Sequence, residues 1–107
     1  EVTTIVGMTT TLPKRARKPQ KQGELEVRWA NMLAAMERHE KFHEEQARRA
    51  GEMIEQAILG LEPGLSCDFV KDAASKVANK ILRDQRKVSR DYDKDTNYGA
   101  NRGITLL

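Results

Sequence analysis

The chain has 107 residues, 33% of them charged and 38% hydrophobic, which leaves room for one domain with a small core. Its net charge of +3 is too small to indicate a nucleic-acid partner unless the charge is clustered. Its single cysteine, Cys67, excludes an internal disulfide and a cysteine-based zinc site within one chain, and no apolar run is long enough to cross a membrane.

Residues 1–13 have the alternating pattern of a β-strand. Apolar residues of one parity are interleaved with threonines, and Pro13 ends the run. The residues that share this parity are Val2, Val6, Met8 and Leu12. The chain begins with Glu1 rather than Met, so we expect an upstream segment to have been removed, by processing or by design.

A basic loop is predicted at residues 14–23. Its positive charges could contact phosphates or acidic polymers, but a run of this kind is more often a solvated loop. No aromatic residue is interleaved to stack on bases, so no nucleic-acid partner is expected. The charged residues are Lys14, Arg15, Arg17, Lys18 and Lys21.

Two long helices are predicted next, at residues 24–61 and 66–92. In each, apolar residues recur at steps of three or four, which traces one face of a helix. Gly60 and the pair Pro63-Gly64 supply the stop and the turn, and Ser66 or Asp68 can cap the second helix. The short link favours an antiparallel hairpin. A tail loop at 93–107 completes a single domain, 1–107, of the helix-dominated α+β class.

Both histidines of the chain fall in one motif, His39-Glu40-Lys41-Phe42-His43. Residues four apart lie one above the other on a helix, so two imidazoles can bind one zinc ion. Glu40 is placed to act as general base on the zinc-bound water. His39 and His43 also lie on the apolar stripe, where a charged imidazole is costly without a partner. The alternative is a pair of hydrogen-bonded core histidines, or solvated ones on a slightly rotated helix.

A catalytic zinc site usually has three protein ligands and an open position for water. If the helices run antiparallel about the turn near Pro63, residue 43 faces residues 84–85. Asp84, or Gln85, is then one candidate for the third ligand, and a tail aspartate is another; Asp84 can equally be a plain surface carboxylate.

The motifs resemble those of a bacterial family, domain of unknown function 922, described as predicted secreted zinc-dependent proteases. The likeness runs from about Thr11 to Gly103. Its residues are Thr11-Leu12-Pro13, Trp29, His39-Glu40-x-x-His43 and Tyr92-Asp93-x-x-Thr96-x-x-Gly99-x-x-x-Gly103.

Two tail residues are expected to take part in the site. The family's tail usually reads Thr-x-His-Gly, and Tyr98 stands where that His would be, so, if that His is the third zinc ligand, the resemblance implies that this chain uses Tyr98 through its phenolate, takes another ligand or binds zinc weakly. A metal lowers the pKa of a coordinated phenol, which makes tyrosine ligation chemically reasonable. Asp93 is expected to orient a zinc-binding His through its free ring nitrogen, unless it is a turn or cap carboxylate.

We therefore expect a minimal zincin-like core that hydrolyses peptide bonds with Zn²⁺, acting on a peptide or protein substrate. The resemblance implies a secreted or periplasmic location. The alternative is a non-catalytic helical hairpin that serves as an interaction module and has a structural or vestigial zinc site.

Overall fold

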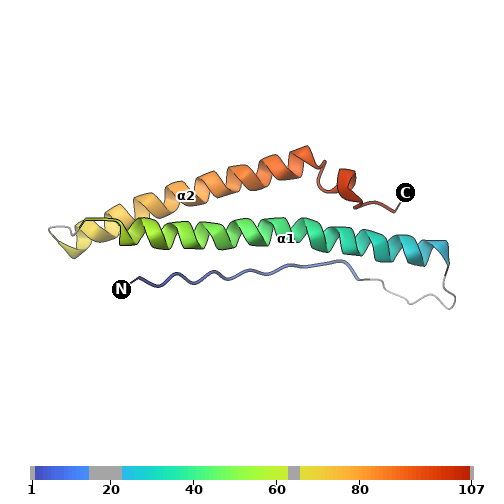
Figure 1. The fold of residues 1–107 in the computed structure, drawn as a ribbon, viewed down its shortest axis with the longest axis horizontal. Helices are drawn as coiled ribbons and strands as arrows, with labels where there is room; N and C mark the ends of the chain where they lie inside the picture. The colour runs from blue at the N-terminus through green and yellow to red at the C-terminus, as the bar shows by residue number, and fades with distance from the viewer. Residues whose placement is uncertain (1, 15–22, 63–65, 107) are drawn as a thin grey trace.

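The computed structural model describes residues 2–14, 23–62 and 66–106, and these form a thin helical layer. Helix α1 spans Glu24–Leu59, α2 spans Cys67–Asp95, and a short 3-10 helix, η1, spans Ala100–Arg102. Figure 1 shows α2 on one side of α1 and the extended N-terminal segment on the other. The molecule measures 69 × 26 × 16 Å. Neither long helix is apolar enough to span a membrane.

The predicted N-terminal strand is wrong, and with it the α+β class. Residues 2–14 run extended and antiparallel to α1 (Figure 1), but no strand is formed within the described ranges. A strand needs a neighbour that accepts and donates its backbone hydrogen bonds. No backbone hydrogen bond joins this segment to another described residue. The described fold is therefore all-helical. Most of the predicted basic loop, residues 15–22, lies outside the described residues.

Side chains hold the N-terminal segment against α1. Thr10 Oγ1 donates a hydrogen bond of 2.7 Å to Glu44 Oε1. Val6 lies against Gly51, where a Cβ atom would overlap the valine Cγ2 methyl. The missing side chain of Gly51 thus allows the extended segment to approach the helix closely.

The helical hairpin is as predicted, and its ends have local causes. Ser66 caps α2, since its side chain accepts a hydrogen bond of 3.2 Å from the Phe69 backbone N–H. Glu24 and Glu26 lie in the first turn of α1, where their negative charges interact favourably with the positive end of the helix dipole. Helix α2 continues to Asp95 rather than ending at residue 92, so Asp93 lies on a helix and not in the tail.

Candidate metal centre

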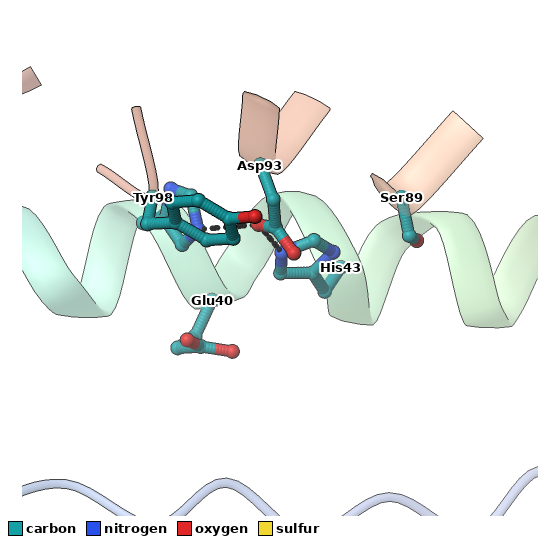
Figure 2. Close-up of a pocket in the computed structure, with 6 residues that line it drawn as sticks. Glu40, His43, Ser89, Asp93 and Tyr98 are labelled. Atoms are coloured by element: carbon teal, nitrogen blue, oxygen red, sulfur yellow. Dashed lines mark hydrogen bonds and ion pairs between the residues drawn. The ribbon is translucent and has the colours of Figure 1, made fainter. Parts of the chain in front are cut away.

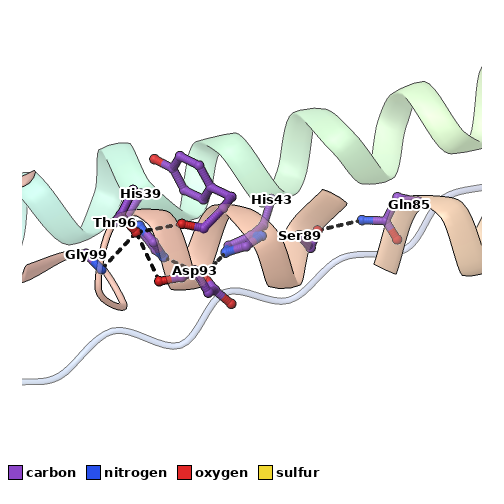
Figure 3. A network of polar contacts seen from close by, with 8 residues as sticks. His39, His43, Gln85, Ser89, Asp93, Thr96 and Gly99 are labelled. Carbon is purple, nitrogen blue, oxygen red and sulfur yellow. Dashed lines mark hydrogen bonds and ion pairs between the residues drawn. The ribbon is translucent and has the colours of Figure 1, made fainter. Parts of the chain in front are cut away.

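Two imidazoles of α1 and one carboxylate of α2 meet between the helices. His39 is buried, with 6% of its surface exposed, and His43 is half-buried. Their Nε2 atoms lie 2.9 Å and 2.8 Å from the same oxygen, Asp93 Oδ1. Figure 3 shows both rings beside this carboxylate, and Figure 2 shows His43 directed at it. The spacing of the His-Glu-x-x-His motif therefore brings both imidazole nitrogens to one point.

Tyr92 fixes the orientation of the rings. Its ring stacks on His39, with centroids 4.9 Å apart, and on Phe42, with centroids 3.7 Å apart. His43 meets the same ring edge-on at 5.6 Å. Stacking of this kind limits rotation of both imidazoles. In the sequence, Tyr92 stands out as the first residue of the tail motif, whereas in the structure its ring contacts both imidazoles of the site.

His39, His43 and Asp93 form a group that could hold a metal ion, because their ligand atoms all lie within 4.8 Å of one another. In a tetrahedral zinc site with bonds of about 2.0–2.2 Å, neighbouring ligand atoms are about 3.3–3.6 Å apart. Each imidazole Nε2 would need to move roughly 0.4–0.8 Å away from Asp93 Oδ1 to reach that spacing. Nitrogen and carboxylate oxygen are ligands that zinc accepts, so these residues fit the ion.

Asp93 occupies a different position from the one expected. A carboxylate that orients a metal-binding His accepts a hydrogen bond from the ring nitrogen opposite the metal. Asp93 instead contacts Nε2 of both rings, the atoms that face the shared point. The other nitrogen of His39, Nδ1, is buried and has no hydrogen-bond partner among the described residues. The geometry groups Asp93 with the imidazoles as a candidate ligand.

Glu40 and Tyr98 line the same pocket, of about 440 Å³, together with the three candidate ligands and Ser89. Figure 2 shows the Glu40 carboxylate extending toward the N-terminal segment, whereas the Tyr98 ring lies on the side of α1 where Asp93 is. Among the described contacts, none joins Glu40 to an imidazole. The pocket thus brings the predicted base and the predicted ligands together without fixing the base against them.

Tyr98 sits in an unusual backbone conformation. Its φ is 54° and that of Asn97 is 51°, both in the left-handed region that side chains disfavour. The Tyr98 side chain is largely exposed at the pocket, and its backbone N–H donates a hydrogen bond of 2.6 Å to the Asp93 carbonyl. The tail thus turns back directly after the helix that carries Asp93. Tyrosine ligation of a metal stays a prediction.

Thr96 stabilises this turn through hydrogen bonds, a role that was not predicted from the sequence. It is 3% exposed, and its hydroxyl donates a hydrogen bond of 2.8 Å to the Tyr92 carbonyl. The same oxygen accepts a hydrogen bond of 3.1 Å from the Gly99 backbone N–H. Figure 3 shows these bonds beside the His39–Asp93 contact. The threonine of the tail motif was a signal, but only the structure shows which atoms it joins.

Asp84 does not reach the site. It accepts a hydrogen bond of 3.0 Å from Lys80 and lines a separate groove with Arg49 and Ala50. Figure 1 places the start of α2 beyond the end of α1, so the two helices are offset relative to a turn centred at Pro63. The offset brings Asp93, rather than residue 84 or 85, level with the histidines.

Comparison with known proteins gives one finding. No curated protein and no solved structure matches the chain. One family pattern, described as bacterial protein of unknown function, matches residues 1–99, which is nearly the whole chain and includes the full pocket up to Gly99. The chain therefore belongs to the bacterial family DUF922, domain of unknown function 922.

Proposed function

We propose that this chain is a zinc-dependent peptidase. The observation that carries the proposal is the convergence of two Nε2 atoms and Asp93 Oδ1 on one point, in a pocket that Glu40 and Tyr98 also line. Two imidazoles four residues apart on a helix, with a glutamate after the first, are the residues that peptide hydrolysis at zinc uses. His39, His43 and Asp93 would hold the ion.

A zinc ion held by His39, His43 and Asp93 would supply a water molecule of lowered pKa and a Lewis acid for the carbonyl of the scissile bond. Glu40 accepts the proton of the attacking water and later delivers it to the leaving amine. Its carboxylate is half-buried and has no described partner, so rotation of the side chain can bring it over the imidazoles. The free carboxylate supports a role as base.

Tyr98 is suited to hydrogen-bond the negative oxygen that develops during the attack. Its exposed side chain borders the pocket, and a phenol donates a strong hydrogen bond to an oxyanion. Direct ligation through the phenolate is the other role for this residue. A substitution that separates the two is Tyr98→Phe, which removes the hydroxyl and keeps the ring. It should lower turnover alone in the first case and zinc affinity in the second.

The N-terminal segment suits an extended polypeptide as the substrate. Residues 2–14 present backbone N–H and C=O groups that have no backbone partner among the described residues, and Glu40 extends toward this segment (Figure 2). A peptide in extended conformation can pair with such an edge. Pairing there would bring its backbone past Glu40.

The test combines metal analysis with a matched pair of variants. Protein purified without a His tag, exposed to zinc and dialysed should retain about one zinc per chain. Glu40→Gln should keep the zinc but lose nearly all hydrolysis of an unfolded protein such as casein, because an amide cannot accept the proton. Glu37→Gln, an exposed position on the same helix, is the control and should retain activity. Wild-type protein that keeps no zinc would refute the proposal.

One observation favours a second candidate, a non-catalytic hairpin with a structural metal. Glu40 has no described contact with His39, His43 or Asp93, and Figure 2 shows its carboxylate directed away from His43 and Asp93. Zinc retention with no hydrolysis of any peptide by the wild type would favour this candidate, whereas Glu40→Gln should keep its zinc in either case.

A further inference from the structure

The whole chain, with its N-terminal segment, buries far less surface than a compact protein of its size. Its accessible surface is 8695 Å², whereas a compact chain of this mass exposes about 6,000 Å². Its radius of gyration is 19.9 Å, against about 13 Å for a globular domain of this length. The excess of about 2,700 Å² exceeds the roughly 800 Å² that each partner buries in a standard protein interface.

The open surface includes an apolar groove between the helices. Met53 of α1 and Val88 of α2 are 57% and 44% exposed there. No described residue of α2 is buried, although its apolar residues follow one face. The groove is lined by Gln46, Arg49, Ala50, Met53, Ile81, Asp84, Gln85 and Val88.

This groove opens on the face opposite the metal pocket. Glu40 and Arg49 are nine residues apart on α1, about two and a half helical turns, so they point to opposite sides. Asp93 and Asp84 are also nine residues apart on α2. Glu40 and Asp93 line the metal pocket, whereas Arg49 and Asp84 line the groove. A partner bound in the groove would therefore leave the metal pocket accessible.

The charges at the groove are of opposite sign on the two helices. Arg49 on α1 is 65% exposed and lies 3.7 Å from Glu45 of its own helix. Asp84 on α2 is 66% exposed and pairs with Lys80 of its own helix. Exposed pairs of this kind add little stability, so both side chains are available to a new partner.

We propose that the groove is the interface of a homodimer, in which two α1–α2 layers pack face to face about a two-fold axis parallel to the helices. This axis lays α1 of one copy over α2 of the other at the same level. Arg49 then faces Asp84 of the second copy, and the contact occurs twice. Met53 and Val88 of both copies fill the centre of a four-helix bundle. A perpendicular axis would instead set α1 over α1 and bring like charges together.

Sedimentation of the full chain tests the proposal. The wild type should form a particle of twice the 12.1 kDa chain mass. Met53→Glu should yield monomers, because a carboxylate in the apolar centre has no partner. Ile5→Glu is the matched control, since Ile5 is 89% exposed on the N-terminal segment, on the far side of α1 from α2. It should leave the dimer intact.

Charge exchange at exposed positions tests the arrangement without disturbing the fold. Arg49→Asp and Asp84→Arg should each weaken the dimer about tenfold, and the double variant should recover most of this loss. Zinc binding per chain should be the same in monomer and dimer. A wild type that is monomeric at its highest soluble concentration would overturn the proposal and assign the face to a different protein. A dimer that Ile5→Glu dissociates, or a double variant that recovers nothing, would overturn it equally.

Discussion

The two ends of the hairpin are held by different kinds of contact. At the end where α2 leads into the C-terminal residues (the tail end), His39 and Thr96 are buried, and Tyr92 stacks on two rings of α1. At the turn end, Leu59 and Phe69 are more than half exposed, and the ion pairs described there join residues of one helix. The hairpin is thus ordered by its own side chains around the metal pocket. At the turn end the described ion pairs join neighbours on one helix, so this end depends more on helix propensity than on contacts between the helices.

The largest expected effect is the loss of zinc-dependent stability when His39, at the tail end, is replaced. His39→Ala removes a candidate ligand and the stack on Tyr92, so zinc should no longer stabilise the protein. For a wild type at zinc a thousandfold above Kd, that stabilisation is about 4 kcal/mol. Thermal unfolding with and without zinc measures it. Asp84→Ala, in the groove, is the control and should keep the full zinc effect. A zinc-induced rise in Tm that survives in His39→Ala would remove this residue from the site.

Smaller changes in the free energy of unfolding are expected when one hydrogen-bonded side chain at each end is removed. Thr96→Val removes the hydroxyl that donates to the Tyr92 carbonyl and accepts from the Gly99 N–H, at a cost of about 0.5–1.5 kcal/mol for each hydrogen bond lost. The Gly99 N–H keeps the Thr96 backbone carbonyl as its acceptor. Ser66→Ala removes the cap of α2, at a cost of about 1 kcal/mol. Urea unfolding of the metal-free protein gives both values. Only Thr96→Val should also weaken zinc binding, because the turn positions the residues after Asp93. Equal zinc affinity in both variants would contradict this role.

The sequence predicted what depends on local pattern. Steps of three and four in apolar residues gave both helices, and the spacing of His39 and His43 gave the convergence of their nitrogens. Ser66 was one of two cap residues named in advance. Each of these features needs only a few neighbouring residues, so one sequence is enough to reveal it.

Features that depend on how distant segments meet were not predictable in this way. Alternation in residues 1–13 indicates a strand, but a strand forms only where a second edge is present, and no described residue supplies one. The register between α1 and α2 depends on where the chain reverses. An offset of a few residues put Asp93, and not Asp84, against the histidines. The stack on Tyr92 follows from the same register.

Replacement of Tyr98 by glycine should change the free energy of unfolding by less still, and should raise it rather than lower it. A non-glycine residue in the left-handed region costs roughly 1 kcal/mol, and the exposed Tyr98 side chain adds little packing in return. Tyr98→Gly should therefore raise the stability of the metal-free protein by up to about 1 kcal/mol, while it lowers activity or zinc affinity. Tyr98→Phe keeps the backbone strain and should leave stability unchanged. A destabilised Tyr98→Gly would show that the ring packs on the pocket more firmly than its exposure indicates.

The smallest effect concerns Asp91, two residues from Asp93 but on the solvent side of α2. Lys87 donates a hydrogen bond of 2.7 Å to its carboxylate, and this bond lowers the pKa of Asp91 below its ordinary value of 3.8. A carboxyl with a lowered pKa adds stability above its unfolded pKa, and that stability is lost as the pH falls through the folded pKa. Asp91→Asn should therefore be slightly less stable than the wild type at neutral pH, and the difference should vanish in acid. Thermal unfolding of the metal-free wild type and Asp91→Asn, from neutral to acidic pH, measures this difference in stability.

Asp93→Asn should instead weaken zinc binding strongly at neutral pH, because its carboxylate lies between the two imidazoles. If Asp91→Asn weakened zinc binding as much as Asp93→Asn, the assignment of the carboxylate ligand would be wrong.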